Sequence, residues 1–209
     1  MKGIKNIIFD FGGVIINLDM PATTRELNKL GEVKFDSLEK KLSGNGWFDR
    51  FEKGLISETD FFSEIRKNIR FKGSDADLVR AWNAMLLDLP EHRLDVLLES
   101  KKNYRTFLLS NTNETHIHCF ESDMYRAHGI RNFGDYFDKL YYSCRINMRK
   151  PDKEIFEYVL EKNNLRPEET VFIDDSVQHV KGAGDSGINA FLLNPNMEVG
   201  DLLKELKLL

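Results

Sequence analysis

The ten residues 4–13 read IKNIIFDFGG and decide the fold. A short apolar run that ends at a polar residue and a glycine pair is typical of a buried strand followed by a tight turn, so the first seven of these residues are predicted to form a strand. Similar apolar runs recur at residues 106–109, 140–142, 171–173 and 190–193, each bounded by polar or turn-forming residues. We expect these runs to be the other strands of one sheet.

Helical patterns lie between and after these strands. They cover residues 152–163, 176–186 and 197–207, where apolar side chains such as Ile155 and Val159 recur three to four positions apart. Strands that alternate with helices form a mostly parallel sheet covered on both faces. The sequence therefore predicts an α/β fold with a Rossmann-like, doubly wound sheet.

The stretch of residues 17–86 breaks this alternation. It contains charged amphipathic segments at about 22–30, 35–43, 57–70 and 74–85 and no convincing strand. An insertion directly after the first strand hangs over the carboxyl edge of a parallel sheet, where such sheets bind ligands. We predict a helical cap at this place that acts as a lid.

The predicted domain organisation follows from this break. Residues 1–16 and 87–209 would form the α/β core, and residues 17–86 the cap.

Composition narrows the function. The 209 residues carry a formal net charge of −4, so no global attraction to nucleic acid or an anionic membrane is expected, and the partner should be a small molecule. Cys119 and Cys144 are the two cysteines, and their spacing supports neither a disulfide scaffold nor a zinc site. The early apolar run is interrupted at Asp10, short of a signal peptide or membrane span. A cytoplasmic protein fits these features best, and its oligomeric state is not readable.

Polar groups gather at the predicted carboxyl ends of the strands. Asp10 follows the first strand, Ser110-Asn111 follows the second, Lys150 lies in a later loop, and Asp174-Asp175 follows another strand. Each has an ordinary reading alone, since an Asp at a strand end is often a helix cap and a lone Lys is usually solvated. Clustered carboxylates with oxygen-only surroundings suit Mg²⁺, and a Lys and a Ser beside them suit a phosphate.

These residues carry a resemblance to a known family. The segments FDFGGV (9–14), LLSNTN (108–113), MRKPD (148–152) and FIDDS (172–176) are similar in order and spacing to motifs one to four of the haloacid dehalogenase superfamily of hydrolases. The chain more narrowly resembles the bacterial alpha-D-glucose-1-phosphate phosphatase group. It resembles more distantly the phosphatase domain of soluble epoxide hydrolase.

The resemblance implies roles for the motif residues. It makes Asp10 the nucleophile that forms an aspartyl-phosphate, which water then hydrolyses. Ser110 and Asn111 match the phosphate-binding motif, and Lys150 matches the basic residue that steadies nucleophile and phosphate.

The resemblance also implies a metal site. It places Mg²⁺ between Asp10, the backbone carbonyl of Gly12 and Asp175. Asp174 is expected to act on the metal through water.

Two positions depart from the family pattern. Most phosphatases of the superfamily have an Asp, acting as general acid and base, where this chain has Gly12, so turnover of substrates with poor leaving groups is expected to suffer. The glucose-1-phosphate phosphatase group also resembles this chain in having Gly there, and a water or a substrate group would then serve. His179 stands where Asn is expected and is interpreted as a surface or cap-facing residue without a role.

Aromatic residues of the predicted cap are mostly explained by packing. Trp47 and Phe48, beside a glycine turn, are the better candidates for substrate contact, and Trp47 is the predicted substrate-binding residue. Arg50 and Glu52 are polar neighbours of these aromatics, although such charges usually lie on a solvated face.

The resulting hypothesis is a Mg²⁺-dependent phosphatase of a small phosphorylated metabolite, such as glucose 1-phosphate. A metal-independent haloacid dehalogenase is the nearest enzymatic alternative, but it would have no use for the Asp174-Asp175 pair. A weakly active phosphate-binding regulatory protein is the alternative from another class, kept open by Gly12. A phosphomutase is disfavoured because the acid and base it needs is missing.

Overall fold

A computed structural model describes residues 3–35 and 46–209. These residues form a five-stranded, all-parallel sheet in the order β3-β2-β1-β4-β5. The strands are β1 (Asn6–Phe9), β2 (Arg105–Ser110), β3 (Lys139–Tyr142), β4 (Thr170–Asp174) and β5 (Asn189–Leu192). The predicted α/β fold with a Rossmann-like parallel sheet is confirmed, and each of the five strands lies within two residues of its expected bounds.

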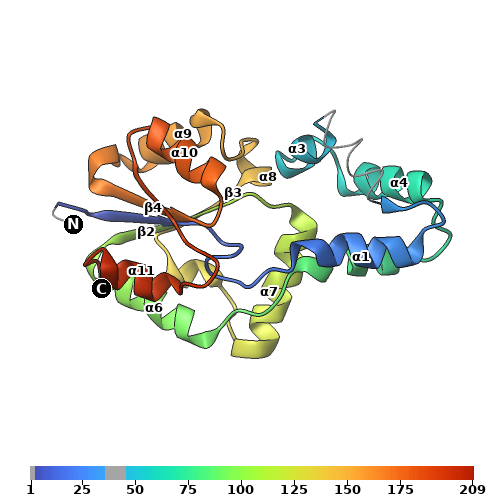
Figure 1. The fold of residues 1–209 in the computed structure, drawn as a ribbon, viewed down its shortest axis with the longest axis horizontal. Helices are drawn as coiled ribbons and strands as arrows, with labels where there is room; N and C mark the ends of the chain where they lie inside the picture. Colours follow the sequence, from blue (N-terminus) through green and yellow to red (C-terminus); the bar gives the residue numbers. More distant parts are fainter. Residues whose placement is uncertain (1–2, 36–45) are drawn as a thin grey trace.

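Helices cover both faces of the sheet (Figure 1). One face carries α9 (Lys153–Asn163) and α10 (Val177–Asp185), and the other carries α6 (Glu91–Asn103), α7 (Glu114–His128) and α11 (Val199–Glu205). The central strand β1 contributes to both apolar layers because successive side chains point to opposite faces. This two-sided burial explains why the strand sequences are continuous apolar runs.

Shorter elements complete the core. These are α8 (Ser143–Ile146) and the 3₁₀ turns η2 (Phe133–Tyr136) and η3 (Pro167–Glu169). No helix among residues 3–35 and 46–209 has the length and apolar character needed to cross a bilayer.

The inserted segment folds as a helical lobe. It contains α1 (Met20–Leu30), α3 (Trp47–Glu52), α4 (Glu58–Ile69), α5 (Asp75–Trp82) and the 3₁₀ turn η1 (Asn83–Met85). Three of the four expected helical segments are found. The fourth, expected at 35–43, lies almost wholly outside the described residues, and α3 was not expected as a helix.

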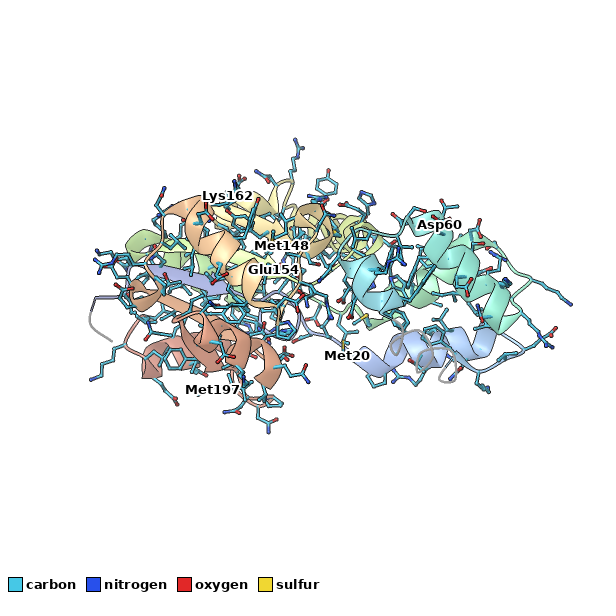
Figure 2. All side chains as sticks on the ribbon, turned by 90° about the horizontal axis from the view of Figure 1, so that it is seen from above. Met20, Asp60, Met148, Glu154, Lys162 and Met197 are labelled. Carbon is cyan, nitrogen blue, oxygen red and sulfur yellow. The ribbon has the colours of Figure 1, made fainter. Side chains whose placement is uncertain are left out.

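The helical lobe has an apolar core of its own, in which Phe51, Phe61 and Trp82 pack together. Figure 2 shows the lobe with Asp60 at one end of the molecule, and Met20 at the junction with the sheet domain. The two chain segments that join the lobes are hydrogen-bonded to each other, with an antiparallel bridge between Leu18 and Leu86. The division of the chain into a core of residues 1–16 and 87–209 and a cap of residues 17–86 stays a prediction.

Candidate active site

Asp10 lies at the centre of the sheet edge. Its strand β1 pairs with both β2 and β4, so the residues that follow those two strands flank it. The backbone N–H of Asp10 donates to the carbonyl of Ile173 at 2.9 Å, which fixes the strand end. The chain then turns at Gly13, whose φ is +72°, and a Cβ there would lie 2.2 Å from Asp175 Oδ2. Only glycine therefore allows the first loop to approach this carboxylate so closely.

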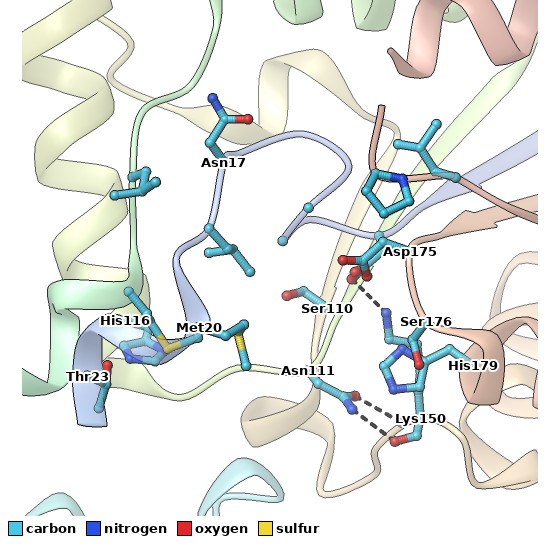
Figure 3. Close-up of a pocket in the computed structure, with 18 of the residues that line it drawn as sticks. Asn17, Met20, Thr23, Ser110, Asn111, His116, Lys150, Asp175, Ser176 and His179 are labelled. Carbon is cyan, nitrogen blue, oxygen red and sulfur yellow. Dashed lines mark hydrogen bonds and ion pairs between the residues drawn. The ribbon is translucent and has the colours of Figure 1, made fainter. Parts of the chain in front are cut away.

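Lys150 is the buried cation of the site. Its side chain is fully buried, and its Nζ donates to Asp10 Oδ1 and to Asp174 Oδ2, both at 2.6 Å. Figure 3 shows Lys150 at the cavity, joined to Asn111 by two hydrogen bonds. Burial alone would lower the pKa of this amine, but the two carboxylates outweigh it and raise the pKa. Lys150 is therefore charged, and it is held between the carboxylates of Asp10 and Asp174.

Lys150 carries one positive charge and faces two carboxylates, those of Asp10 and Asp174. When both carboxylates are ionised, one negative charge is not compensated. Burial raises the pKa of Asp10 to about 7, with Asp174 adding to the effect and Lys150 opposing it. Burial also acts to raise the pKa of Asp174, but Lys150 and His179 outweigh it and hold the value at about 2. A cation bound between the acids would relieve this repulsion and favour ionised Asp10.

The second motif positions Lys150 as well as the phosphate site. The side-chain amide of Asn111 donates to the carbonyl of Lys150 and accepts from its N–H, each at 2.9 Å. Both ends of the Asn111 side chain are thus engaged, which ties the loop of Lys150 to the end of β2. Ser110, at the end of β2, is buried and lines the cavity beside Asp10.

The acidic residues fit a hard cation. Asp10, Asp174 and Asp175 offer carboxylate oxygens that lie within 4.8 Å of one another, with no sulfur or nitrogen ligand in this group. Such an oxygen-only set matches the preference of Mg²⁺, which binds one or two carboxylates and fills its remaining positions with water and phosphate. The donor set therefore fits the magnesium expected from the sequence.

The two acids of motif four have different surroundings. Asp174 accepts from Lys150, from the backbone N–H of Ser176 at 2.8 Å and from Nδ1 of His179 at 3.0 Å. Asp175 is more exposed and lies against the Gly13 turn. This difference agrees with the expectation that Asp175 binds the metal directly and Asp174 acts from behind it, and that assignment stays a prediction.

His179 is a site residue that sequence reasoning passed over. Its ring contacts Asp174 and lines the cavity, with 19% of the side chain exposed. This position agrees with the interpretation of His179 as a cap-facing residue. It does not agree with the interpretation that His179 has no role, because the imidazole helps to hold Asp174. Its place five residues after Asp174, on the first turn of α10, was the available signal.

Position 12 is a glycine. A neighbouring side chain takes up the space where the side chain of an acid at this position would lie. Gly12 lines the cavity, and a Cβ at this position would lie 2.5 Å from Leu18 Cδ1. Leu18 thus occupies the space beside the loop that a side chain at position 12 would need. The loop itself supplies no second carboxylate near the nucleophile, as the sequence indicated.

A cavity of about 1080 Å³ lies between the sheet edge and the helical lobe. Asp10, Ser110 and Lys150 line its floor. The helical lobe lines its roof with Phe48, Trp82 and other residues, which are Met20, Thr23, Thr24, Phe35, Glu52 and Met85. Trp47, predicted to bind substrate, is not among the lining residues and packs on the apolar core of the lobe.

His116 joins the two lobes. It is buried on α7, and its ring stacks on Trp82 at 5.4 Å between centroids. Its Nδ1 faces the amide of Asn113 at 3.2 Å and therefore accepts, so Nε2 carries the proton and donates to the carbonyl of Trp82 at 3.4 Å. Burial lowers the pKa of His116 to about 4, so the ring is neutral at pH 7. Sequence reasoning gave no signal for this residue.

The family comparison agrees with this geometry. The haloacid dehalogenase-like hydrolase family matches residues 4–187. Among relatives, D-ribitol-5-phosphate phosphatase of Bacteroides thetaiotaomicron is 31% identical over 90% of this chain and 91% of its own length. Sesquiterpene phosphatase of Aspergillus oryzae is 27% identical over 97% of this chain and 96% of its own length.

Solved structures agree as well. A haloacid dehalogenase family enzyme of Bacteroides thetaiotaomicron, crystallised as a magnesium complex, is 37% identical and superposes with a TM-score of 0.87, covering 97% of this chain and all of its own. The chain belongs to the haloacid dehalogenase-like hydrolase family. Its fold, its acidic cluster and its family define a phosphoric monoester hydrolase that uses Mg²⁺.

Proposed function

We propose that the chain hydrolyses the phosphate ester of a small sugar or sugar alcohol through an aspartyl-phosphate on Asp10. The observation that carries the proposal is the geometry of the cavity, which has the carboxylate of Asp10 and the cation of Lys150 on its floor and a mixed polar and aromatic roof. Its volume is at the upper end of what small-molecule sites enclose. Hydroxyl groups of Thr23 and Thr24 and the amide of Asn17 lie on its walls, and these are suitable partners for a polyol.

The chain's own residues perform the chemistry in two stages. Asp10 attacks phosphorus and the ester oxygen leaves, while Lys150 and Ser110 hold the phosphoryl oxygens in place. A water then attacks phosphorus and restores the carboxylate. Mg²⁺, when bound by Asp10, the carbonyl of Gly12 and Asp175, spreads the negative charge in both stages.

The substrate is the finer part of the proposal. Glucose 1-phosphate is the candidate from the sequence, and ribitol 5-phosphate is the substrate in the name of the 31% identical relative. A Mg²⁺-supplemented assay of phosphate release should include both, with glucose 6-phosphate and xylitol 5-phosphate beside them. We expect kcat/KM for at least one phosphorylated polyol or sugar to exceed that for p-nitrophenyl phosphate. A preference for p-nitrophenyl phosphate over all of them would contradict the proposal.

A phosphorylated isoprenoid is a second candidate. Met20 and Leu87 line the cavity and are large apolar side chains that are 63% and 48% exposed. The 27% identical relative is named as a sesquiterpene phosphatase. Farnesyl phosphate in the same assay distinguishes the two classes, and its preference over all polyol phosphates would favour the isoprenoid.

The rivals in mechanism are tested with the same protein. A dehalogenase of this fold would act on a haloacid without metal, whereas the proposed phosphatase should lose activity in EDTA and regain it with Mg²⁺. A regulatory protein would bind phosphate without hydrolysing any ester.

The cytoplasmic location also stays a proposal, supported by the free thiols of Cys119 and Cys144.

The metal assignment has its own test. Asp175→Ala should raise the Mg²⁺ concentration needed for half-maximal activity more than Asp174→Ala does. The opposite order would reverse the direct and indirect roles of the two acids.

A further inference from the structure

The carboxylates that line the cavity have different roles. Among the described lining residues they are Asp10, Asp175, Glu198 and Glu52. Asp10 is the nucleophile, and Asp175 belongs to the metal cluster. Glu198 is clamped by Arg93 at 2.8 Å, and the hydrogen bonds from this arginine hold its pKa at about 2. This leaves Glu52, the one described lining carboxylate on the helical lobe, without an assigned task.

Glu52 is held over the cavity by contacts of the two residues that follow it. It is the last residue of α3, and the next residue, Lys53, pairs with Asp152 at 2.8 Å and accepts from the amide of Asn147 at 2.7 Å. A Cβ at Gly54 would lie 2.2 Å from the carbonyl oxygen of Cys144. The end of α3 therefore rests directly on the backbone of the sheet domain.

Burial of Glu52 favours its protonated form, although it faces an arginine. Arg149 faces two carboxylates of the lobe, with Nη1 at 2.6 Å from Asp49 and Nη2 at 2.9 Å from Glu52. One guanidinium cannot neutralise both, and Glu52 is the more buried, with 30% of its side chain exposed against 55% for Asp49. Burial raises the pKa of Glu52, Asp49 adds to this, and Arg149 and His179 oppose it.

We propose that Glu52 is the general acid and base of the reaction and does from the cap the work that position 12 cannot do. Glu52 and Asp10 line the same cavity from opposite lobes. The inference rests on the phosphatase activity assigned above and adds one catalytic residue to it.

The proton balance runs through both stages. When Asp10 attacks, the P–O ester bond breaks, its electron pair goes to the leaving oxygen, and the proton of the Glu52 carboxyl converts that oxygen to an alcohol. In the second stage a water oxygen bonds to phosphorus, its proton passes to the Glu52 carboxylate, and the bond to Asp10 breaks with its electron pair returning to Asp10. Inorganic phosphate leaves, and both carboxyl groups regain their starting state.

This role changes the expected dependence on the leaving group. The sequence, with Gly12 and no acid, predicts rates that depend steeply on leaving-group pKa and a faster reaction with glucose 1-phosphate than with glucose 6-phosphate. With Glu52 donating the proton, the dependence of kcat/KM in the unmodified enzyme should be shallow. Removing the acid should restore the steep dependence.

The test compares Glu52→Gln with Asp49→Asn. Both variants remove a partner of Arg149 from α3, but only Glu52 lines the cavity. For Glu52→Gln, kcat/KM for a primary alkyl phosphate should fall by about 10²- to 10⁴-fold, and that for p-nitrophenyl phosphate by much less. Its aspartyl-phosphate should also accumulate, so p-nitrophenol should appear as a burst equal to the enzyme. Asp49→Asn should lower both substrates by the same factor and show no burst.

A uniform loss in Glu52→Gln, equal to that of Asp49→Asn, would overturn the inference and leave Glu52 as a docking residue. A burst that appears in His179→Asn but not in Glu52→Gln would move the role to His179. If neither the unmodified protein nor any of these variants hydrolyses a phosphate ester, the proposed phosphatase function itself fails.

A measurement on the unmodified enzyme needs no variant. The ratio of kcat/KM for the alkyl phosphate to that for the aryl phosphate, each referred to the concentration of the substrate dianion, cancels the ionisations of nucleophile and metal site. This ratio should fall as the pH rises and Glu52 loses its proton. A ratio that stays constant over the whole pH range in which the enzyme is active would also overturn the inference.

Discussion

The floor and the roof of the cavity are built on different principles. The floor consists of strand ends, where Lys150 and Asp174 are fully buried and bonded to each other within the sheet edge. The roof consists of helices whose side chains pack on one another, and it meets the floor through Arg149, Lys53 and His116. Buried charges tolerate few substitutions, whereas a roof of packed helices held by partly exposed ion pairs can vary in sequence. The floor should therefore fix the nucleophile and the phosphate site, and the roof should fix the substrate and, through Glu52, the proton transfer.

The sharpest test of the floor is Asp10→Asn. The substitution removes the nucleophile and a carboxylate of the metal cluster with little change of volume. We expect kcat to fall on the order of 10⁴-fold or more while the fold is kept. Circular dichroism and phosphate release measure the two effects. Retained activity with an unchanged spectrum would disprove the mechanism.

Lys150→Met tests whether the floor depends on its buried cation. The variant leaves Asp10 and Asp174 without their shared partner in a buried site. The free energy of unfolding should fall by about 3–5 kcal/mol. Urea unfolding with Lys153→Met as control measures this, since Lys153 is an exposed residue of α9 and its loss should cost about 0.5 kcal/mol or less. Equal losses would mean that burial of Lys150 carries no special weight.

The contact between floor and roof can be tested at His116, which packs on Trp82. Its pKa is lowered from 6.5 to about 4 in the folded protein, so the unfolded chain binds the proton more readily. Stability should therefore fall as the pH drops from about 6.5 to 4, by up to about 3 kcal/mol from this residue. In His116→Gln this part of the pH dependence should vanish, whereas His118→Gln, an exposed histidine on the same helix, should keep it. Unfolding free energies in urea at pH 4 to 7 decide between the two results.

Phe48 and Trp47 test the roof. The sequence singles out Trp47 for substrate contact, but Phe48 lines the cavity. Phe48→Leu should change the ratio of kcat/KM between two phosphorylated substrates by about tenfold, and Trp47→Leu should change it less. Steady-state kinetics on glucose 1-phosphate and p-nitrophenyl phosphate provide the ratios. Equal losses on both substrates would indicate a folding defect of the lobe.

Most of the fold could be predicted because each strand is a continuous apolar run, which two-sided burial requires. The helix α3 was missed because its six residues, Trp47–Glu52, are too short to show a helical period. The helices α6 and α7 were not singled out either, although both cover the sheet. Helix ends and short helices depend on neighbours that are distant in sequence, and a single sequence does not show those neighbours.

The sequence by itself determined the floor of the site. Asp10, Ser110, Lys150 and Asp174-Asp175 each follow a strand or lie in a loop beside one, and parallel strands bring such positions to one edge. Only the tertiary structure decided which groups the roof brings to them. Leu18 fills the space beside Gly12, and Glu52 reaches the cavity from a helix that is placed by contacts with residues about one hundred positions later in the chain. Local sequence patterns show where the strands end, and so which residues lie at the edge of the sheet. The docking of one lobe on the other depends on the shapes and charges of both lobes.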